Sequence, residues 1–311
     1  MTSTATSPGA FAHPALFYRG DAEYVAGTVP FLREGIAAGE PVAVAAPVPR
    51  LDLIRAELGT AAADVRFVDM TEAGRNPGRI IPSVLRGFAD AAGGGRVRII
   101  GEPVWPGRTD TEYPACIQHE ALINEAFAGR EVTILCPYDA AGLAAGVLAD
   151  AHATHPVVID GGRARASTAY APGAVLARCN ERLPHPPGAA TVRFDGDTLP
   201  VTRDAALDAA RERGMTAARR QDLALVVAEL TTNSVIHGGG SGTLRLWTEG
   251  GHLVCQVRDA GRLTDPLAGR HPVAPQQIGG RGLFLVHYLS DLVRVHTGES
   301  GTTIRSYLGI C

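Results

Sequence analysis

Residues 223–240 read LALVVAELTTNSVIHGGG, and this stretch decides how the second half of the chain folds. Apolar residues recur along it at the spacing of one helical face, at Leu223, Val226, Val227 and Leu230. This stripe predicts an amphipathic helix over residues 216–237, which the glycines at 238–240 end. Glu229 and Asn233 stand four residues apart, so their side chains stack on one face of that helix. The amide can ligate Mg²⁺ and the carboxylate can orient a nucleophile, although a lone pair of this kind is more often a solvated helix face.

The segments that follow predict two hairpins with a glycine-led helix between them. Their elements are strands at 243–248 and 252–257, a helix at 283–289, and strands at 292–297 and 302–308. Asp259-Ala260-Gly261 ends the first hairpin, and Gly279-Gly280-Arg281-Gly282-Leu283 opens the helix. Glycines at a helix N-terminus let backbone N–H groups approach a phosphate, and the helix dipole favours the anion. The order of these segments predicts a nucleotide site more strongly than any one of them does.

The order ExxxN, DxG, GGxGL and GTT resembles the ATP-binding domain of the GHKL class, the Bergerat fold, over residues 191–311. Residues 229–237 resemble most closely the anti-sigma factors that have serine kinase activity. The resemblance implies an α+β domain with helices on one face of a mixed sheet, and ATP with Mg²⁺ as cofactors. Asn233 would be the Mg²⁺ ligand, and Glu229 the catalytic base or orienter for a serine hydroxyl. The remaining nucleotide contacts that it implies are Asp259 at the adenine amino group, Gly261 beside the base, Gly280, Arg281, Gly282 and Leu283 around the phosphates, and Thr302 or Thr303 on the adenine side.

Two features depart from the family pattern. The first glycine-containing box often reads DxGxG, whereas Leu263 occupies its last position, which bears on closure of the lid at 262–278 more than on binding. No dimerisation helix pair with a phosphoacceptor histidine precedes Glu229, so a conventional sensor histidine kinase is not predicted. His287 lies inside the helix at 283–289, where we expect it to be packed. An aspartate that accepts from an exocyclic amine would reject guanine, which agrees with ATP as the nucleotide.

The first half of the chain alternates helical stretches with short β-rich runs. The helices are expected at 21–38, 50–58, 78–92, 112–128 and 141–151, and the strands at 42–46, 65–68, 97–100, 132–135 and 157–159. Apolar runs of this length between helices predict a parallel sheet with helices on both faces. Ligands of such sheets bind at the carboxyl ends of the strands, where Glu102, Trp105, Tyr138 and Asp139 stand. Structural turns with satisfied polar groups are the equally open alternative.

Several short motifs of this half together resemble the MEDS sensory domain, over residues 10–172. They are His13-Pro14, Tyr18, Gly101-Glu102-Pro103-Val104-Trp105, Glu120-Ala121-Leu122-Ile123-Asn124, Leu135-Cys136-Pro137-Tyr138-Asp139 and His155-Pro156. The resemblance implies a RecA- or KaiC-like α/β fold that senses an unidentified small molecule. The candidate sensory pocket comprises His13, Tyr18, Glu102, Trp105, Tyr138 and Asp139. His13, Cys136 and His155 carry metal-ligating atoms, but we expect ordinary packed side chains there.

The composition excludes several kinds of chemistry. The chain has 311 residues, a length typical of two domains, and its 29 basic residues are all arginine. Without lysine there is no P-loop, no kinase of the eukaryotic type and no Schiff-base enzyme. A net charge of −3 leaves no basic footprint for nucleic acid, and the five cysteines lack metal-binding spacing. No apolar run could cross a membrane, so we expect a cytoplasmic protein with free thiols.

These observations predict a disordered tail at 1–10, a sensory domain at 11–179, a linker at 180–188 and an ATPase domain at 189–311. The family resemblance implies an anti-sigma factor that binds an alternative sigma factor and phosphorylates a serine or threonine of an anti-anti-sigma protein of the STAS type. The sensory half would modulate that activity, and a homodimer is the usual form. A non-catalytic ligand-gated adaptor, with ATP structural or absent, is the alternative, which Leu263 favours.

Overall fold

The computed structural model describes residues 11–272 and 280–310, and the chain divides into two compact units between Cys179 and Asn180. The tail predicted at 1–10, Gly279 and residues 273–278 of the expected lid lie outside the described residues. The described helices include none that is both long and apolar enough to span a bilayer.

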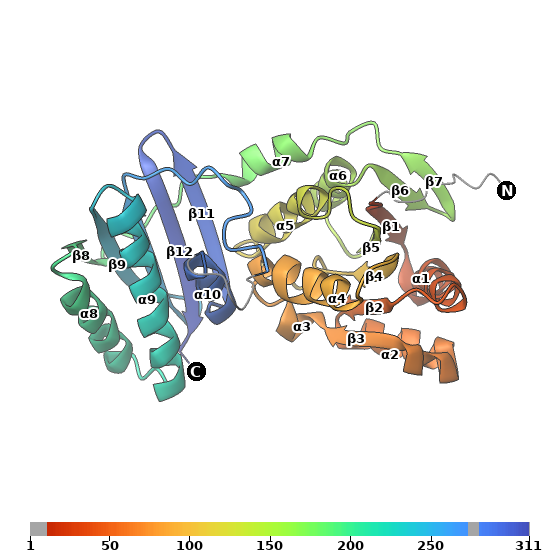
Figure 1. The fold of residues 1–311 in the computed structure, drawn as a ribbon, viewed down its shortest axis with the longest axis horizontal. Coiled ribbons are helices and arrows are strands. Elements are labelled where there is room, and N and C mark those ends of the chain that lie inside the picture. The colour runs from red at the N-terminus through yellow and green to blue at the C-terminus, as the bar shows by residue number, and fades with distance from the viewer. Residues whose placement is uncertain (1–10, 273–279, 311) are drawn as a thin grey trace. The chain divides into compact units, whose positions relative to one another are not determined.

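A seven-stranded sheet in the order β3-β2-β4-β5-β1-β6-β7 forms the centre of the first unit (Figure 1). Its strands are β1 (Pro14–Tyr18), β2 (Val42–Ala46), β3 (Val65–Asp69), β4 (Val97–Gly101), β5 (Val132–Asp139), β6 (Val157–Asp160) and β7 (Arg163–Ala166). Neighbouring strands pair in parallel, except that the edge strand β7 runs antiparallel to β6. The predicted α/β fold class is therefore confirmed, with one antiparallel edge that the sequence did not predict.

Helices cover both faces of this sheet. They are α1 (Gly20–Ala37), α2 (Val48–Leu58), α3 (Met70–Ala73), α4 (Arg86–Ala91), α5 (Tyr113–Ala126), α6 (Ala145–Thr154) and α7 (Pro172–Cys179), with the 3-10 helices η1 (Gly59–Asp64) and η2 (Pro77–Arg79) and the π-helix η3 (Ile80–Leu85). Apolar side chains of α1 and α2 pack with Leu16 and Tyr18 of β1 and Leu135 of β5. Because side chains alternate along a strand, Phe17, Cys136 and Tyr138 face the opposite side.

The helix predicted at 78–92 is interrupted. The structure forms η2, then the π-helix η3 and only then α4 over this stretch. Pro82 lies inside η3 and has no amide hydrogen, so the ordinary i to i−4 bond at that position is missing and the backbone adopts a wider turn. A proline within the predicted helix was the signal for this break.

In the second unit the described residues form a five-stranded sheet, in the order β11-β12-β10-β9-β8, and three helices. Its elements are β8 (Ala190–Asp195), α8 (Leu199–Glu212), α9 (Ala217–His237), β9 (Ser241–Glu249), β10 (His252–Asp259), α10 (Gly282–Leu289), β11 (Leu292–Gly298) and β12 (Gly301–Gly309). Each adjacent pair among these strands is antiparallel, so the mixed sheet that the resemblance implied is corrected to an antiparallel one. The α+β class itself is confirmed.

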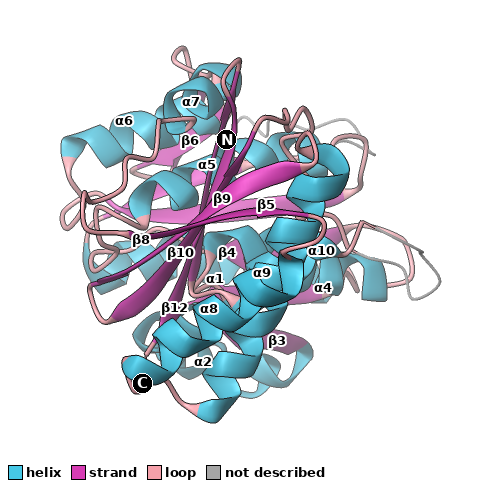
Figure 2. Cartoon of the chain, turned by 90° about the vertical axis from the view of Figure 1, so that its left-hand side faces the viewer, coloured by secondary structure: helices cyan, strands magenta, loops and turns pink. Residues whose placement is uncertain are grey.

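All three helices pack on one face of this sheet. A single apolar core joins α8, α9 and α10 to alternate residues of the strands, such as Leu253, Cys255 and Val257 of β10. Helices α8 and α9 run side by side (Figure 1 and Figure 2). Thr216 caps α9, because its side chain accepts a hydrogen bond from the Arg219 amide. The apolar stripe predicted on α9 is the part of the helix that enters this core.

The segment predicted as a linker is hydrogen-bonded to the sheet of the second unit. The Asn180 side chain donates to the Thr297 carbonyl at 2.8 Å and accepts from the Thr297 amide at 2.9 Å. Further along, the Pro184 carbonyl accepts from the Arg305 guanidinium. The prolines of this segment exclude regular secondary structure, as predicted. The hydrogen bonds to Thr297 and Arg305 nevertheless fix the path of the segment along β11 and β12.

We predict that Gly301→Ala destabilises the second unit more than Gly250→Ala. Both glycines lie in hairpin turns with positive φ, 110° and 54° respectively, but a Cβ at Gly301 would lie 1.9 Å from the Asp259 carbonyl oxygen, whereas Gly250 faces open space. The left-handed backbone alone costs alanine about 1–2 kcal/mol. Overpacking should add about 1–3 kcal/mol at Gly301. Urea unfolding of both variants measures the difference, and equal losses would contradict the close approach.

Candidate functional site

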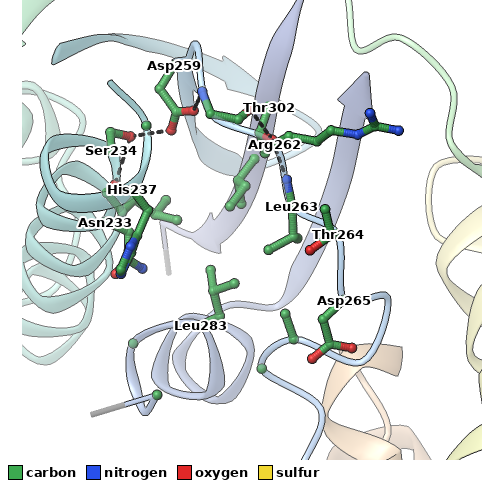
Figure 3. A pocket seen from close by; sticks show the side chains of 18 of the residues that line it. Asn233, Ser234, His237, Asp259, Arg262, Leu263, Thr264, Asp265, Leu283 and Thr302 are labelled. Carbon is green, nitrogen blue, oxygen red and sulfur yellow. Dashed lines mark hydrogen bonds between the residues drawn. The ribbon is translucent and has the colours of Figure 1, made fainter. Parts of the chain in front are cut away.

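The end of strand β10 is held against helix α9 through the carboxylate of Asp259. Its Oδ2 accepts from the Ser234 hydroxyl at 2.6 Å, and its Oδ1 accepts from the Gly261 amide at 2.9 Å (Figure 3). Each oxygen keeps a further lone pair for another donor. Asp259 is therefore fixed in orientation and still able to accept a hydrogen bond from a ligand.

Glycines allow this close contact between α9 and β10. A Cβ on Gly238 would lie 2.4 Å from Cγ of Asp259, and one on Gly261 would lie 2.5 Å from the His237 carbonyl oxygen. The Ala260 amide donates to the Gly238 carbonyl at 3.1 Å, which closes the same junction. Both positions need glycine, because a side chain at either one would push the helix and the strand apart.

A pocket of about 570 Å³ opens beside this junction, between α9, the sheet and α10. Asn233 and Asp259 both line it, and Figure 3 shows Leu283 projecting into it from α10. The residues implied by the family resemblance that line it are Asn233, Asp259, Gly261, Gly280, Gly282, Leu283 and Thr302. Seven of the predicted nucleotide residues thus converge from distant parts of the sequence onto one cavity.

Glu229 does not line this pocket but lies beside the first turn of α10. A Cβ on Gly282 would come within 2.6 Å of Glu229 Oε2 and 3.1 Å of Asn233 Nδ2, so both side chains reach the N-terminus of α10. Arg281 is the exposed N-cap residue of that helix and does not line the cavity. A helix N-terminus attracts anions, so a carboxylate and an amide beside it suit a site for phosphates with a bound cation.

The two threonines implied for the adenine side have different positions. Thr302 lines the pocket, and its hydroxyl donates to the Gly261 carbonyl at 2.9 Å. Thr303 points to the opposite face of the sheet, because neighbouring residues of a strand alternate. It pairs there with His296 of β11, whose ring contacts the Asn180 carbonyl at 3.0 Å. Of the pair, the structure selects Thr302.

Leu263 takes the place of the family glycine without backbone strain. No described residue other than glycine has a positive φ, so the conformation here does not need a glycine. The Leu263 amide donates to the hydroxyls of Thr297 at 3.0 Å and Thr302 at 3.2 Å. The start of the segment predicted as a lid is therefore attached to the sheet.

Sequence reasoning missed the supporting hydroxyls of this site. Ser234 directly follows Asn233 in the predicted helix. Because successive side chains point in different directions around a helix, Ser234 points toward Asp259, to which its hydroxyl donates a hydrogen bond. Thr297 is the last residue but one of strand β11 and was assigned no role. Serine and threonine residues beside a motif have many structural roles. Only the folded structure therefore shows that Ser234 and Thr297 support this site.

The first unit has a smaller pocket, of about 530 Å³, at the carboxyl edge of its sheet. Of the predicted sensory residues, Tyr18, Glu102, Trp105 and Asp139 line it. The buried Glu102 carboxylate accepts from the Tyr18 hydroxyl at 2.9 Å and from the Tyr24 hydroxyl at 3.3 Å. Burial raises the pKa of Glu102 to about 7, although the hydrogen bond from Tyr18 opposes the rise.

Arg50 is the pocket residue that the sequence reasoning did not identify. Its guanidinium lies 5.0 Å from the ring centres of both Tyr18 and Tyr24, and it forms an ion pair with Asp21 at 2.6 Å. The pocket thus combines a guanidinium group, aromatic ring faces and a carboxyl group whose pKa is raised to about 7. Such a lining suits a small polar molecule with an apolar part.

His13 and Tyr138 lie outside this pocket, which corrects the predicted set. Tyr18 pairs with Asp139 across β1 and β5, whereas Tyr138 pairs with Phe17 and therefore faces the other side of the sheet. His13 precedes β1 on that same opposite side and is buried beside His155. Burial is the main reason why the pKa of His13 is lowered to about 4.

Comparison with known proteins matches one family to each of the two units. Residues 12–156 match the family described as MEDS, the methanogen/methylotroph DcmR sensory domain. Residues 192–307 match the family described as the histidine kinase-like ATPase domain. No curated protein matches the chain. Among solved structures, the histidine kinase AdeS of Acinetobacter baumannii is 12% identical, covers 39% of this chain and 68% of its own, and has a TM-score of 0.24.

We predict that Glu102→Gln flattens the pH dependence of stability between about pH 4.5 and 7. Because the folded-state pKa of Glu102 is raised to about 7, the folded protein binds more protons than the unfolded chain in this window. The wild type should therefore lose stability relative to the variant as the pH rises, by at most about 1.4 kcal/mol per pH unit. Urea unfolding of both proteins at several pH values measures this, and parallel pH profiles would contradict the raised pKa.

Proposed function

The chain joins a MEDS sensory domain to a histidine kinase-like ATPase domain, and from this pairing we propose an ATP-dependent anti-sigma factor with serine or threonine kinase activity. The main support for nucleotide binding is that Asn233 and Asp259 line the same pocket. An amide oxygen is a suitable Mg²⁺ ligand, and a fixed carboxylate is a suitable acceptor for the adenine amino group.

The phosphates would extend from the adenine side toward the N-terminus of α10. Backbone amides of Gly280 and Gly282 and the positive end of the helix would receive them, and Mg²⁺ on Asn233 would neutralise their charge. Phosphoryl transfer asks mainly for positioning and charge neutralisation, so no covalent intermediate with the protein is required. The absence of lysine from the chain is compatible with this arrangement.

Glu229 would orient the accepting hydroxyl or take its proton. Its carboxylate reaches the first turn of α10, beside Asn233 and therefore beside the expected position of the terminal phosphate. A general base at this position contributes about 10²–10⁴-fold to the rate of transfer.

The segment before α9 favours a separate protein as the phosphate acceptor. Between residues 180 and 229 the one histidine is His185, which lies in the extended segment rather than on a helix. Helix α8 contains no histidine. A phosphoacceptor histidine on a paired helix is thus not offered by this part of the chain, which supports transfer to a serine or threonine of an anti-anti-sigma protein of the STAS type.

In the proposed regulation, the alternative sigma factor binds the ATPase domain and a small molecule in the Glu102 pocket changes that interaction. A homodimer is part of this proposal. A non-catalytic adaptor is the second candidate, because Leu263 is attached to Thr297 and Thr302 at the start of the expected lid. Restricted lid motion would affect turnover more than nucleotide binding.

We predict that two substitutions on α9 separate binding from transfer. Asn233→Ala should abolish Mg²⁺-dependent stabilisation by ATP, which for the wild type is about 2.7 kcal/mol at a hundredfold excess over Kd. Glu229→Gln should keep that stabilisation and lower the transfer rate about 10²–10⁴-fold. Thermal unfolding with ATP, ADP or GTP measures binding, and labelled ATP with STAS proteins of the same genome measures transfer to serine or threonine.

The matched control is Thr232→Ala, which changes a neighbouring residue of α9 that does not line the pocket. It should behave as the wild type in both assays. ATP stabilisation without transfer to any STAS protein would favour the adaptor, and unchanged ATP stabilisation of Asn233→Ala would refute the nucleotide assignment.

A further inference from the structure

Four side chains with metal-ligating atoms meet in the interior of the first unit, on the sheet face opposite the Glu102 pocket. They are His13, Glu120, Cys136 and His155, all of them buried, with one ligand atom from each lying within 4.8 Å of all the others. Glu120 Oε2 lies 3.3 Å from His13 Nε2 and 3.1 Å from His155 Nε2. The Cys136 sulfur lies 3.3 Å from His13 Nε2.

These residues come from distant segments that the fold brings together. His13 and His155 stand just before β1 and β6, which are neighbouring strands, and Cys136 lies on β5, the other neighbour of β1. Glu120 comes from helix α5, which crosses this face. The side-chain alternation that removes His13 from the Glu102 pocket is what directs it to Cys136.

The outer nitrogen of His155 is already hydrogen-bonded to the protein. Its Nδ1 lies 2.9 Å from the Ala151 carbonyl oxygen, which can only accept, so Nδ1 carries the hydrogen. In the tautomer that keeps this hydrogen on Nδ1, the lone pair of Nε2 faces Glu120.

Asn124 holds His13 in the same way. The Asn124 amide nitrogen donates to the Thr154 carbonyl at 2.9 Å and to the Ala121 carbonyl at 3.2 Å, so its oxygen faces His13. That oxygen lies 3.2 Å from His13 Nδ1 and accepts its hydrogen. Metal-binding histidines are characteristically held by such an outer hydrogen bond, which fixes the ring and directs the other nitrogen to the ion.

At the centre of the cluster the Cys136 thiol, beside His13 Nε2, is the donor available to the atoms that meet there. Among the described residues, neither oxygen of Glu120 nor His155 Nε2 has a hydrogen-bond partner of acceptable geometry. Two imidazole lone pairs and a carboxylate directed at one another in a buried site repel unless a positive charge lies between them. A cation coordinated by all four side chains satisfies every one of these atoms.

We propose that His13, Glu120, Cys136 and His155 bind one divalent transition-metal ion, with zinc the best match to the donor set. Four donors placed tetrahedrally about 2.0–2.3 Å from zinc lie about 3.3–3.7 Å from one another. The three donor-to-donor distances of 3.1–3.3 Å in the cluster are close to this expected distance. Two imidazoles, a thiolate and a carboxylate suit zinc, whereas magnesium and calcium prefer oxygen ligands alone.

The ion would have a structural role, because four protein ligands leave no open position for a substrate. It would tie α5 to three neighbouring strands and thereby support the sheet that carries the Glu102 pocket. This site is independent of ATP binding, since all its ligands belong to the first unit.

We predict that the full-length protein contains one equivalent of metal per chain, measured by inductively coupled plasma mass spectrometry for zinc, iron, cobalt, nickel and copper together. Glu120→Gln and Cys136→Ser should lose this metal. Replacement by Co²⁺ should produce a thiolate-to-metal charge-transfer band in the wild type that Cys136→Ser lacks. Asn124→Ala should retain the site but bind zinc about 10–100-fold more weakly, as loss of an outer hydrogen bond does.

The control is Cys179→Ser, a buried thiol of the same unit outside the cluster, which should keep both the metal and the cobalt band. Circular dichroism separates loss of metal from loss of fold, and the Asn124→Ala affinity gives a readout in a protein that retains all four ligands. Wild-type protein that contains no more transition metal than Cys136→Ser, and takes up neither zinc nor cobalt, would overturn the proposal.

Discussion

The contact between Asp259 and helix α9 is the constraint on which the ATPase domain depends. The Ser234 hydroxyl and the Gly261 amide hold the two carboxylate oxygens, and the surrounding glycines let strand and helix approach closely enough for these bonds to form. The same contact fixes the distance between Asp259 and Asn233, because both Asn233 and Ser234 belong to α9. A site that recognises a base at one end and a cation at the other needs this fixed spacing.

Hydrogen bonds connect this site to the segment that leads into the second unit. Asn180 holds the backbone of Thr297, whose hydroxyl lies 3.0 Å from that of Thr302 and accepts from the Leu263 amide. The segment that enters the second unit is therefore two side chains away from the pocket beside Asp259. A sensory domain attached through Asn180 would have a short physical route to the site it is proposed to modulate.

Much of the fold followed from sequence periodicity, and the exceptions have physical reasons. The strand at 42–46 was predicted at its observed limits and the helix ending at His237 within one residue of them, because a continuous apolar run and an apolar stripe mark them clearly. Helix α8 was missed because its first turn contains Pro200 and its surface is polar, although proline is favoured in a first turn. Strand β1 was missed because it is short and begins with a proline, Pro14.

The sites were predictable where an ordered motif exists and unpredictable where the fold alone assembles them. Glu229, Asn233 and Asp259 were identified from their order along the chain, and the structure brings them together. Glu120 and Asn124 were part of a family motif, but nothing in their spacing indicates that they meet His13, more than a hundred residues away. Arg50 was likewise not predictable from the sequence, because the packing of α2 beside α1 is what places it in the Glu102 pocket.

The most direct test of the central claim is a crystal structure of the full chain with Mg²⁺ and a non-hydrolysable ATP analogue. The account predicts that the adenine amino group donates to the Asp259 carboxylate while Asn233 Oδ1 ligates the Mg²⁺ that bridges the phosphates. A nucleotide bound away from this pocket, or a Mg²⁺ ion held without Asn233, would contradict it.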